Sequence, residues 1–449
     1  MPYITIPQSP SFKQLSFEDI LFGNVDADNL FIASNKTNTR TRFVKLVPEK
    51  IMNQVNFTQW VHLIKKWIDK YEHLYEPKAE YDKVMHEYRA AFAERKEYFA
   101  THPRVEVDPI RDQLNSNVSN AQKALNTKDI YSVFFIPKHS GGLREIDAPC
   151  DELMKALREL KELLAFESHP ELLGFKDAKL PMHHTTAFAY VNGRCALDAV
   201  KRHQANKSNW FLKTDFSNFF GNTTPQFLHH MCELVFPFSV LMGNYEWKQV
   251  LTKALDLCFL DGGLPQGTPI SPFLTNLMMI PFDHVVSNNL HQFTNGHSYV
   301  YTRYADDVLI SGRDNFGVNI MVDFMTDVLK RFDAPFELKP SKTRYGSRAG
   351  RNWNLGVMLN KDNQITIGYR KKQSFRAMID SYLKDRANGV KWPLHDLQVL
   401  DGLRNYYKSV EPNFIKERIQ KGYGAKFGVD IEKAIHSDIR NAGGAVVPF

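Results

Sequence analysis

Hydrophobic positions follow two different periods along the chain. Between about residues 56 and 98, apolar side chains recur every three or four positions, as at Trp60, Ile64 and Trp67, and this spacing predicts helices with one apolar face. From residue 131 onward, short runs of β-branched and aromatic residues separated by glycine or acidic turns predict strands. We therefore expect a helical region followed by a region that mixes strands and helices.

Two hairpins are predicted in the mixed region. The first joins a strand at 131–137 to a strand at 143–147 through a glycine turn, and a helix is expected at 151–166. The second occupies 299–312, which reads YVYTRYADDVLISG, and it turns at two adjacent acids. A further strand at 209–216 ends in Asp215, and Pro225 suits the first turn of the helix expected after it.

Helices and one more hairpin are expected around and beyond the acidic turn. An apolar helix is predicted from Pro272 to about Val286, and an amphipathic helix at 316–332. Residues 354–367 suggest a hairpin with a Lys-Asp-Asn turn, and 370–425 carry the pattern of two or three helices.

Composition places the chain among soluble globular proteins. Its 449 residues are 43% hydrophobic and 24% charged, enough for two or three domains, and the net charge of +7 permits nucleic-acid binding without proving it. The four cysteines form no CxxC pair, so neither zinc nor a disulfide framework is expected. The N-terminus has no secretory pattern and no apolar run could span a membrane, so we expect a cytoplasmic protein without a membrane partner.

The acidic turn is the strongest candidate for chemistry. Asp306 and Asp307 at a strand tip repel one another unless a cation lies there, and hard carboxylate oxygens suit Mg²⁺. Asp215 lies 91 residues earlier at the end of a strand and could share the metal across a sheet. Two such ions about 4 Å apart would stabilise the attacking and leaving oxygens of phosphoryl transfer. Taken alone, an Asp-Asp turn is usually an ordinary hairpin turn.

Three other stretches carry polar groups suited to nucleotides. Lys138 and Arg144 flank the glycine turn of the first hairpin, where two cations could grip a triphosphate. In the loop DGGLPQGTPISP, Gln266 and Gly267 would allow close approach to a base pair. Arg194 follows an Asn-Gly turn beside a helix start and suits a template phosphate. If these stretches have no role in binding, they are an ordinary basic hairpin, a Gly/Pro connector and a turn.

The order of these motifs resembles that of the reverse transcriptase family. KTDFSNFF, LPQGTPISP and YADD follow one another as in that family, and FFIPKHSGGLREI and AFAYVNGR resemble its group II intron and retron branch. The likeness extends over about residues 126–425.

The resemblance implies an α+β right-hand polymerase with an antiparallel palm sheet and a helical N-terminal extension. The expected divisions are a mainly helical extension at 1–125, fingers at 126–210, a palm with a primer-grip hairpin at 211–368, and a helical thumb with a C-terminal tail at 369–449. The implied activity is RNA-directed DNA synthesis with Mg²⁺, or with Mn²⁺ as the alternative ion.

The resemblance also implies roles for individual residues. Asp215, Asp306 and Asp307 match the catalytic metal ligands, joined by the backbone carbonyl of Phe216. Phe220 matches the bulky gate that excludes a ribose 2′-hydroxyl and so favours DNA as product. The remaining residues implied to contact the incoming dNTP are Lys138, Arg144, Gln266 and Lys342, the last near the leaving pyrophosphate.

Basic residues gather in the region expected to face the template and primer. From Lys339 to Arg386 there are twelve Lys and Arg against three Asp, which fits a groove lined with phosphates. The candidate nucleic-acid contacts are Arg194, Gly267, Arg370, Lys371 and Lys372. The expected partners are a non-coding RNA template or primer and the cDNA product.

Departures from the family leave several alternatives open. The thumb has no Val-Thr-Gly, no Asn-Ala-x-x-His precedes YADD, and no maturase or HNH-type segment follows the thumb. What remains resembles the defence-associated bacterial reverse transcriptases, which work with a non-coding RNA against phage. The alternatives are a template-independent or protein-primed DNA polymerase and a non-catalytic RNA-binding protein. A homo-oligomer or a protein partner also stays open.

Overall fold

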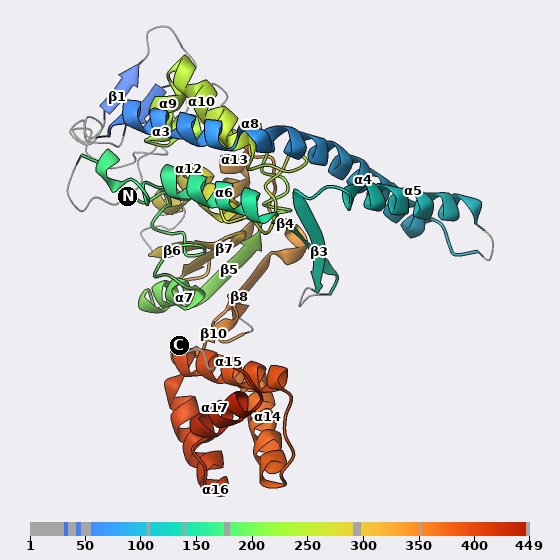
Figure 1. The fold of residues 1–449 in the computed structure, drawn as a ribbon. Helices are drawn as coiled ribbons and strands as arrows, with labels where there is room; N and C mark the ends of the chain where they lie inside the picture. The colour runs from blue at the N-terminus through green and yellow to red at the C-terminus, as the bar shows by residue number, and fades with distance from the viewer. Residues whose placement is uncertain are drawn as a thin grey trace.

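The computed structural model describes residues 31–34, 42–45, 55–105, 108–137, 141–174, 180–290, 298–350 and 353–445. Figure 1 shows three tiers, with helices and a projecting helical arm above, a strand layer in the middle and a separate group of helices below. The upper and middle tiers share one hydrophobic core, and the lower tier has a second.

In its described parts, the N-terminal region is mainly helical, as predicted. An Asn56 side chain accepts a hydrogen bond from the Gln59 amide at 3.1 Å and caps the first helix, and Asp108 caps the last. The elements are β1 (Phe31–Ser34), β2 (Arg42–Lys45), α3 (Phe57–Lys70), the 3₁₀ turn Glu72–Leu74, α4 (Tyr75–Thr101) and α5 (Pro109–Leu125). Helices α4 and α5 form the arm in Figure 1.

Helix α3 packs into the same core as the polymerase-like region. Trp60 is fully buried, and its indole N–H donates to the Leu163 carbonyl at 3.1 Å. The Trp67 indole likewise donates to the Ala156 carbonyl at 3.0 Å. Both carbonyls belong to α6 (Asp151–Leu164), so the extension is joined to its neighbour by buried aromatic residues.

The region expected to be the fingers contains the predicted hairpin. Strands β3 (Tyr131–Pro137) and β4 (Leu143–Pro149) pair antiparallel in the register Val133↔Asp147 and Ile136↔Arg144. They form a separate two-stranded sheet. Helix α6, the 3₁₀ turn Pro170–Leu172 and α7 (Ala196–Ala205) follow.

The middle tier is a four-stranded antiparallel sheet in the order β6-β7-β5-β8. This sheet confirms the predicted palm arrangement, and the acidic hairpin lies at its edge. The strands are β5 (Trp210–Asp215), β6 (Tyr299–Tyr304), β7 (Asp307–Gly312) and β8 (Arg344–Ser347). The 3₁₀ turn Pro340–Lys342 precedes β8. The helices are α8 (Pro225–Leu234), α9 (Phe238–Met242), α10 (Tyr245–Asp256), α11 (Ser271–Met278), α12 (Ile280–Asn289) and α13 (Val318–Arg331).

One predicted helix is wrong in its extent. The apolar run from Pro272 to about Val286 forms two helices, α11 and α12, which meet at Met279. Pro281 explains the break, because it has no amide hydrogen and its ring conflicts with the carbonyl of Leu277 in a continuous helix.

The lower tier holds the C-terminal helices beneath a small three-stranded sheet. The predicted hairpin at 354–367 is present, and a third strand is added on its other side in the order β11-β10-β9. The elements are β9 (Trp353–Asn354), β10 (Val357–Leu359), β11 (Ile365–Thr366), α14 (Tyr369–Ala387), α15 (Leu394–Val410), the π-helix Phe414–Gly424, α16 (Ala425–Phe427) and α17 (Ile431–Asn441). Their core includes Ile379, Leu400 and Ile435 and reaches Phe211 and Leu309 of the palm sheet.

Two further expectations concern cysteines and membranes. Cys150, Cys195, Cys232 and Cys258 are all free. Among the helices in the described parts of the chain, none combines the length and apolar character required to cross a bilayer.

Candidate active site

Strand pairing brings the three predicted acids together. Asp215 at the end of β5 lies opposite Asp307 at the start of β7. The amide of Phe216 donates to the Asp306 carbonyl at 3.2 Å, so the turn between β6 and β7 lies beside the end of β5. Acids 91 residues apart in sequence therefore occupy one end of the palm sheet.

Two lysines lie against these carboxylates. Lys342 Nζ is 2.8 Å from both Asp215 oxygens, and Lys213 Nζ is 3.0 Å from Asp307 Oδ1. The pKa of Asp306 is raised to about 6, first by burial and then by the negative charges of Asp215 and Asp307. The site therefore concentrates negative charge that a cation would relieve.

The donor chemistry fits Mg²⁺, although Asp215 and Asp307 each pair with a lysine in the structure. Within the described ranges, no three His, Cys, Asp or Glu side chains converge as a ready metal-binding group. Three carboxylates on paired strands nevertheless supply the hard oxygen ligands that Mg²⁺ prefers. Asp215 and Asp307 would exchange Lys342 and Lys213 for the ion.

A buried ion pair holds the acidic turn from inside. Arg303 and Asp283 are both fully buried and lie 2.9 Å apart. Arg303 Nη1 also donates to the Ala305 carbonyl at 3.0 Å, directly before Asp306. Ala305 has φ 56°, a left-handed conformation that costs a non-glycine residue about 1 kcal/mol. The arginine therefore stabilises the strained residue that presents Asp306.

The predicted gate residue Phe220 is joined to the glycine loop. Its carbonyl accepts from the Leu264 amide at 3.0 Å, and its ring is half-buried. A Cβ at Gly263 would lie 2.2 Å from the Gly221 carbonyl oxygen, so only glycine allows the loop to lie this close.

The same loop also contacts the fingers strand β4. The Asp147 amide donates to the Gln266 carbonyl at 2.8 Å. Gly267 has φ 134°, and a Cβ there would lie 2.6 Å from the Asp147 carbonyl oxygen. The sequence suggested that Gly267 allows approach to a base pair, whereas the close approach in the structure is to the backbone of the fingers.

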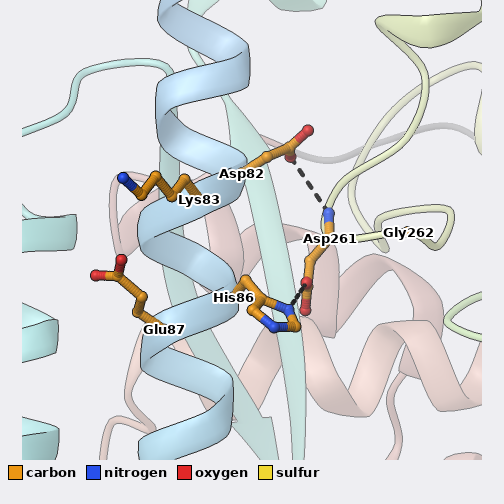
Figure 2. A pocket seen from close by; sticks show the side chains of 6 residues that line it. All are labelled: Asp82, Lys83, His86, Glu87, Asp261 and Gly262. Atoms are coloured by element: carbon orange, nitrogen blue, oxygen red, sulfur yellow. Dashed lines mark hydrogen bonds and ion pairs between the residues drawn. The ribbon is translucent and has the colours of Figure 1, made fainter.

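Helix α4 reaches this junction from the extension. Figure 2 shows Asp82 accepting from the Asp261 amide at 3.2 Å and His86 2.8 Å from the Asp261 carboxylate. Arg89 then joins α4 to both sides of the junction, with ion pairs of 2.7 Å to Glu145 and 3.2 Å to Asp261. The extension thus contacts both the fingers strand and the loop that carries Gln266.

The other predicted contact residues differ in their surroundings. Lys138 lies outside the described residues. Arg144 is exposed on β4, opposite Ile136 near the outer end of the hairpin. Arg194 Nη1 donates to the carbonyls of Thr185 and Ala187 at 2.9 and 2.8 Å, so part of its guanidinium supports its own loop.

The three basic residues at the start of α14 are not equivalent. Lys371 donates to the Gly356 carbonyl at 2.7 Å, and Lys372 pairs with Glu411. Arg370 is exposed and forms no ion pair within the part of the chain that the structure describes. Of the three, Arg370 is the side chain most available to a phosphate.

Sequence reasoning missed Lys213 and the pair Arg303 and Asp283. Strand alternation could have found Lys213, because it lies two residues before Asp215 and so on the same face of β5. The Arg303 pair joins residues on α12 and β6, and no local pattern announces such a contact.

Comparison with known proteins agrees with this geometry. A family model described as reverse transcriptase (RNA-dependent DNA polymerase) matches residues 136–376. The retron Ec83 reverse transcriptase of Escherichia coli is 28% identical, and the match covers 68% of this chain and 90% of that protein. The retron Ec73 reverse transcriptase of the same organism is 24% identical, with 62% and 83% covered.

A third relative and a solved structure also match this chain. The retron Mx65 reverse transcriptase of Myxococcus xanthus is 27% identical over 63% of this chain and 62% of its own length. The apo telomerase of Candida tropicalis, truncated from its C-terminal domain, aligns with a TM-score of 0.37 and 11% identity, covering 75% of this chain and 63% of that one. The family match spans more than half of the chain and includes all three acids, so this protein belongs to the reverse transcriptase family, the RNA-dependent DNA polymerases.

Proposed function

We propose that this reverse transcriptase adds deoxynucleotides to a primer with Asp215, Asp306 and Asp307 as the ligands of two Mg²⁺ ions. The observation that carries the proposal is the pairing of β5 with β7, which places Asp215 opposite Asp307 and the turn of Asp306 beside Phe216. The Phe216 carbonyl completes the proposed ligand set. Mn²⁺ would suit the same oxygens.

The bound ions would activate the primer hydroxyl and stabilise charge on the leaving pyrophosphate. The protein's own part is to hold three carboxylates at fixed positions, and Arg303 fixes the turn of Asp306 for this purpose. Lys342 reaches the same site from the 3₁₀ turn before β8 and would neutralise, or donate a proton to, the pyrophosphate.

Phe220 is proposed to select deoxynucleotides. Its carbonyl accepts from Leu264 and its chain neighbour Gly221 lies against Gly263, so the backbone that carries the ring is held in place. A ring beneath the sugar leaves no space for a 2′-hydroxyl and offers it no hydrogen-bond partner. Phe220→Val should therefore raise the use of rNTPs relative to dNTPs, and an unchanged ratio would reject this assignment.

The template is proposed to be a dedicated non-coding RNA, in the setting of bacterial defence against phage and in the cytoplasm. Support comes from the retron enzymes among the relatives and from the exposed Arg370 on α14. Untemplated or protein-primed synthesis remains the alternative. Sequencing the nucleic acid that co-purifies from cells separates these cases, because a single enriched RNA with matching cDNA favours the first and cDNA without a template favours the second.

The test of the catalytic assignment is the double change Asp306→Asn with Asp307→Asn. We expect dNTP incorporation on a primed RNA template to fall to background, and Mn²⁺ binding measured by electron paramagnetic resonance to weaken. Asp323→Asn on α13 is the matched control, since Asp323 is exposed and lies outside this cluster. Unchanged incorporation by a folded double variant would overturn the assignment.

A further inference from the structure

Tyr190 is an exposed aromatic residue held in an unusual backbone conformation beside the active site. Its φ is 58°, in the left-handed region that tyrosine rarely adopts, and 56% of its surface is exposed. Its ring meets that of Phe220 edge to face, with centroids 6.3 Å apart and an angle of 80°. Strain of this kind is retained where surrounding contacts impose it, and it concentrates at functional sites.

The backbone on the N-terminal side of Tyr190 is anchored to the elements that hold the acidic turn. Asn276 donates to the Ala189 carbonyl at 2.9 Å, and the Phe188 amide donates to the Arg303 carbonyl at 2.9 Å. Asn276 also accepts from Arg303 Nη2 at 3.2 Å. One buried network therefore positions both Tyr190 and the turn that presents Asp306.

Charged groups of both the acidic turn and the fingers act on Tyr190. The pKa of its phenol is raised, first by burial and next by the negative charge of Asp306, while Arg144 acts in the opposite direction. The proposed triphosphate contact Arg144 and the proposed metal ligand Asp306 thus both act on one side chain. A nucleotide that spans these two groups would pass the ring of Tyr190.

Packing alone does not account for this tyrosine. Tyr190 is 56% exposed as a residue, so it buries less apolar surface than a core tyrosine would, and its left-handed backbone costs stability. Asparagine or glycine would meet the backbone requirement more easily than tyrosine. A planar ring at this position is better explained by contact with a ligand than by the fold.

We propose that Tyr190 contacts the incoming deoxynucleotide and forms, with Phe220, an aromatic corner against its sugar and base. The proposal rests on the proposed function, because it assumes that the nucleotide lies between Arg144 and Asp306. Aromatic contacts with nucleotide bases are sequence-tolerant, since every base has a π-face. Tyr190 is therefore a nucleotide-affinity residue that acts on all four dNTPs alike.

Three variants separate the ring, its hydroxyl and the backbone. Tyr190→Asn removes the ring, and asparagine tolerates the left-handed conformation. Tyr190→Gly removes the whole side chain, and glycine adopts this conformation without strain. Tyr190→Phe keeps the ring. We expect the asparagine and glycine variants to raise the KM for each dNTP by about 10-fold or more with a smaller change in kcat, and the phenylalanine variant to stay within about 3-fold.

A second readout keeps this test apart from the test of the metal ligands. Equilibrium binding of a dNTP to the enzyme with a chain-terminated primer on RNA should weaken by a similar factor in Tyr190→Asn, without any turnover. Tyr245→Asn is the control, because Tyr245 is 77% exposed on the distant helix α10. Wild-type KM and dNTP affinity in folded Tyr190→Asn and Tyr190→Gly would overturn the proposal while leaving the carboxylate assignment intact. Loss of dNTP binding in Tyr190→Phe as severe as in Tyr190→Asn would also overturn it, because the hydroxyl and not the ring would then be responsible.

Discussion

The N-terminal helices and the C-terminal helices are both rich in lysine and arginine, but their ion pairs reach different partners. Among the described residues, several pairs of the N-terminal helices reach other regions, whereas those of the C-terminal helices stay among themselves. In the extension, Lys70 pairs with Glu159 at 2.8 Å and Arg89 with Glu145 at 2.7 Å, so α3 and α4 are tied to the fingers. At the start of α14, Arg370 stays exposed and has no ion pair in the described ranges. A count of basic residues therefore cannot separate a structural helix from one available to RNA.

The two regions also differ in their cores. Trp60 and Tyr81 of the extension lie in the same buried cluster as the palm helices, whereas the thumb helices gather around their own cluster. The extension is thus part of the scaffold that holds the active site. Deleting residues 1–120 would remove these core residues, so a loss of RNA selectivity in that variant would report unfolding rather than recognition.

The largest expected effect is on the shared core. Trp60→Ala should lower the free energy of unfolding by about 3–5 kcal/mol, because it opens a cavity and leaves the Leu163 carbonyl without its indole donor. Thermal melting followed by circular dichroism measures this change. If the palm melted at its wild-type temperature in this variant, the extension would be an independent unit that does not share the core of the palm.

A smaller effect should follow from pH at the junction between extension and fingers. The pKa of Asp147 is raised from 3.8 to about 6, chiefly by burial, so the folded protein binds its proton more tightly than the unfolded chain does. The tighter proton binding of folded Asp147 contributes to the free energy of unfolding at low pH. This contribution is fully present below pH 3.8 and is lost as pH rises through about 6. Asp147→Asn cannot ionise, and its stability relative to wild type should increase by about 2–3 kcal/mol from pH 4 to pH 7.

Urea unfolding at several pH values measures this difference. Asp323→Asn serves as the control and should give a nearly constant difference from wild type, since Asp323 is exposed. If the stability difference between Asp147→Asn and wild type were also independent of pH, Asp147 would be solvated and the junction would be looser than the structure shows.

Arg89→Met should have a moderate effect on both stability and synthesis. Arg89 is about a third exposed, so we expect a loss of about 1–2 kcal/mol rather than the larger cost of breaking a fully buried pair. Incorporation of dNTPs should fall as well, because Glu145 and Asp261 lose their common partner. Lys96→Met on the exposed side of the same helix is the control, and equal behaviour of the two variants would contradict a bracing role for Arg89.

The smallest effect on stability is expected at the thumb surface. Arg370→Gln should leave the melting temperature unchanged and lower the log–log salt slope of RNA binding by about one unit. Lys372→Gln should instead lower stability slightly, because it leaves Glu411 without its partner. Filter binding over a series of salt concentrations distinguishes the two, and an unchanged slope for Arg370→Gln would remove this residue from the RNA contact.

Local patterns predicted the parts of the site that are continuous in sequence. The acidic hairpin and the strand before Asp215 follow from alternation and turn chemistry, and the family order of the motifs relates Asp215 to Asp306. Patterns could not reveal contacts made only in space. Arg303 donates to Ala305 within the hairpin, but its guanidinium is paired with Asp283 of α12. Arg89 and Asp261, which also form an ion pair, lie 172 residues apart in the sequence.

The junction of Asp147 with Gln266 and Gly267 has a mechanical consequence. These backbone contacts clamp the root of the β3–β4 ribbon, at the rung where Val133 faces Asp147. Arg89 also holds Glu145 on the rung of Phe135, and beyond that rung Ile136 and Leu143 are 45% and 58% exposed. The ribbon is therefore a cantilever, fixed at one end and compliant at the other. A pull on Arg144 would bend its outer half and leave the position of Gln266 undisturbed.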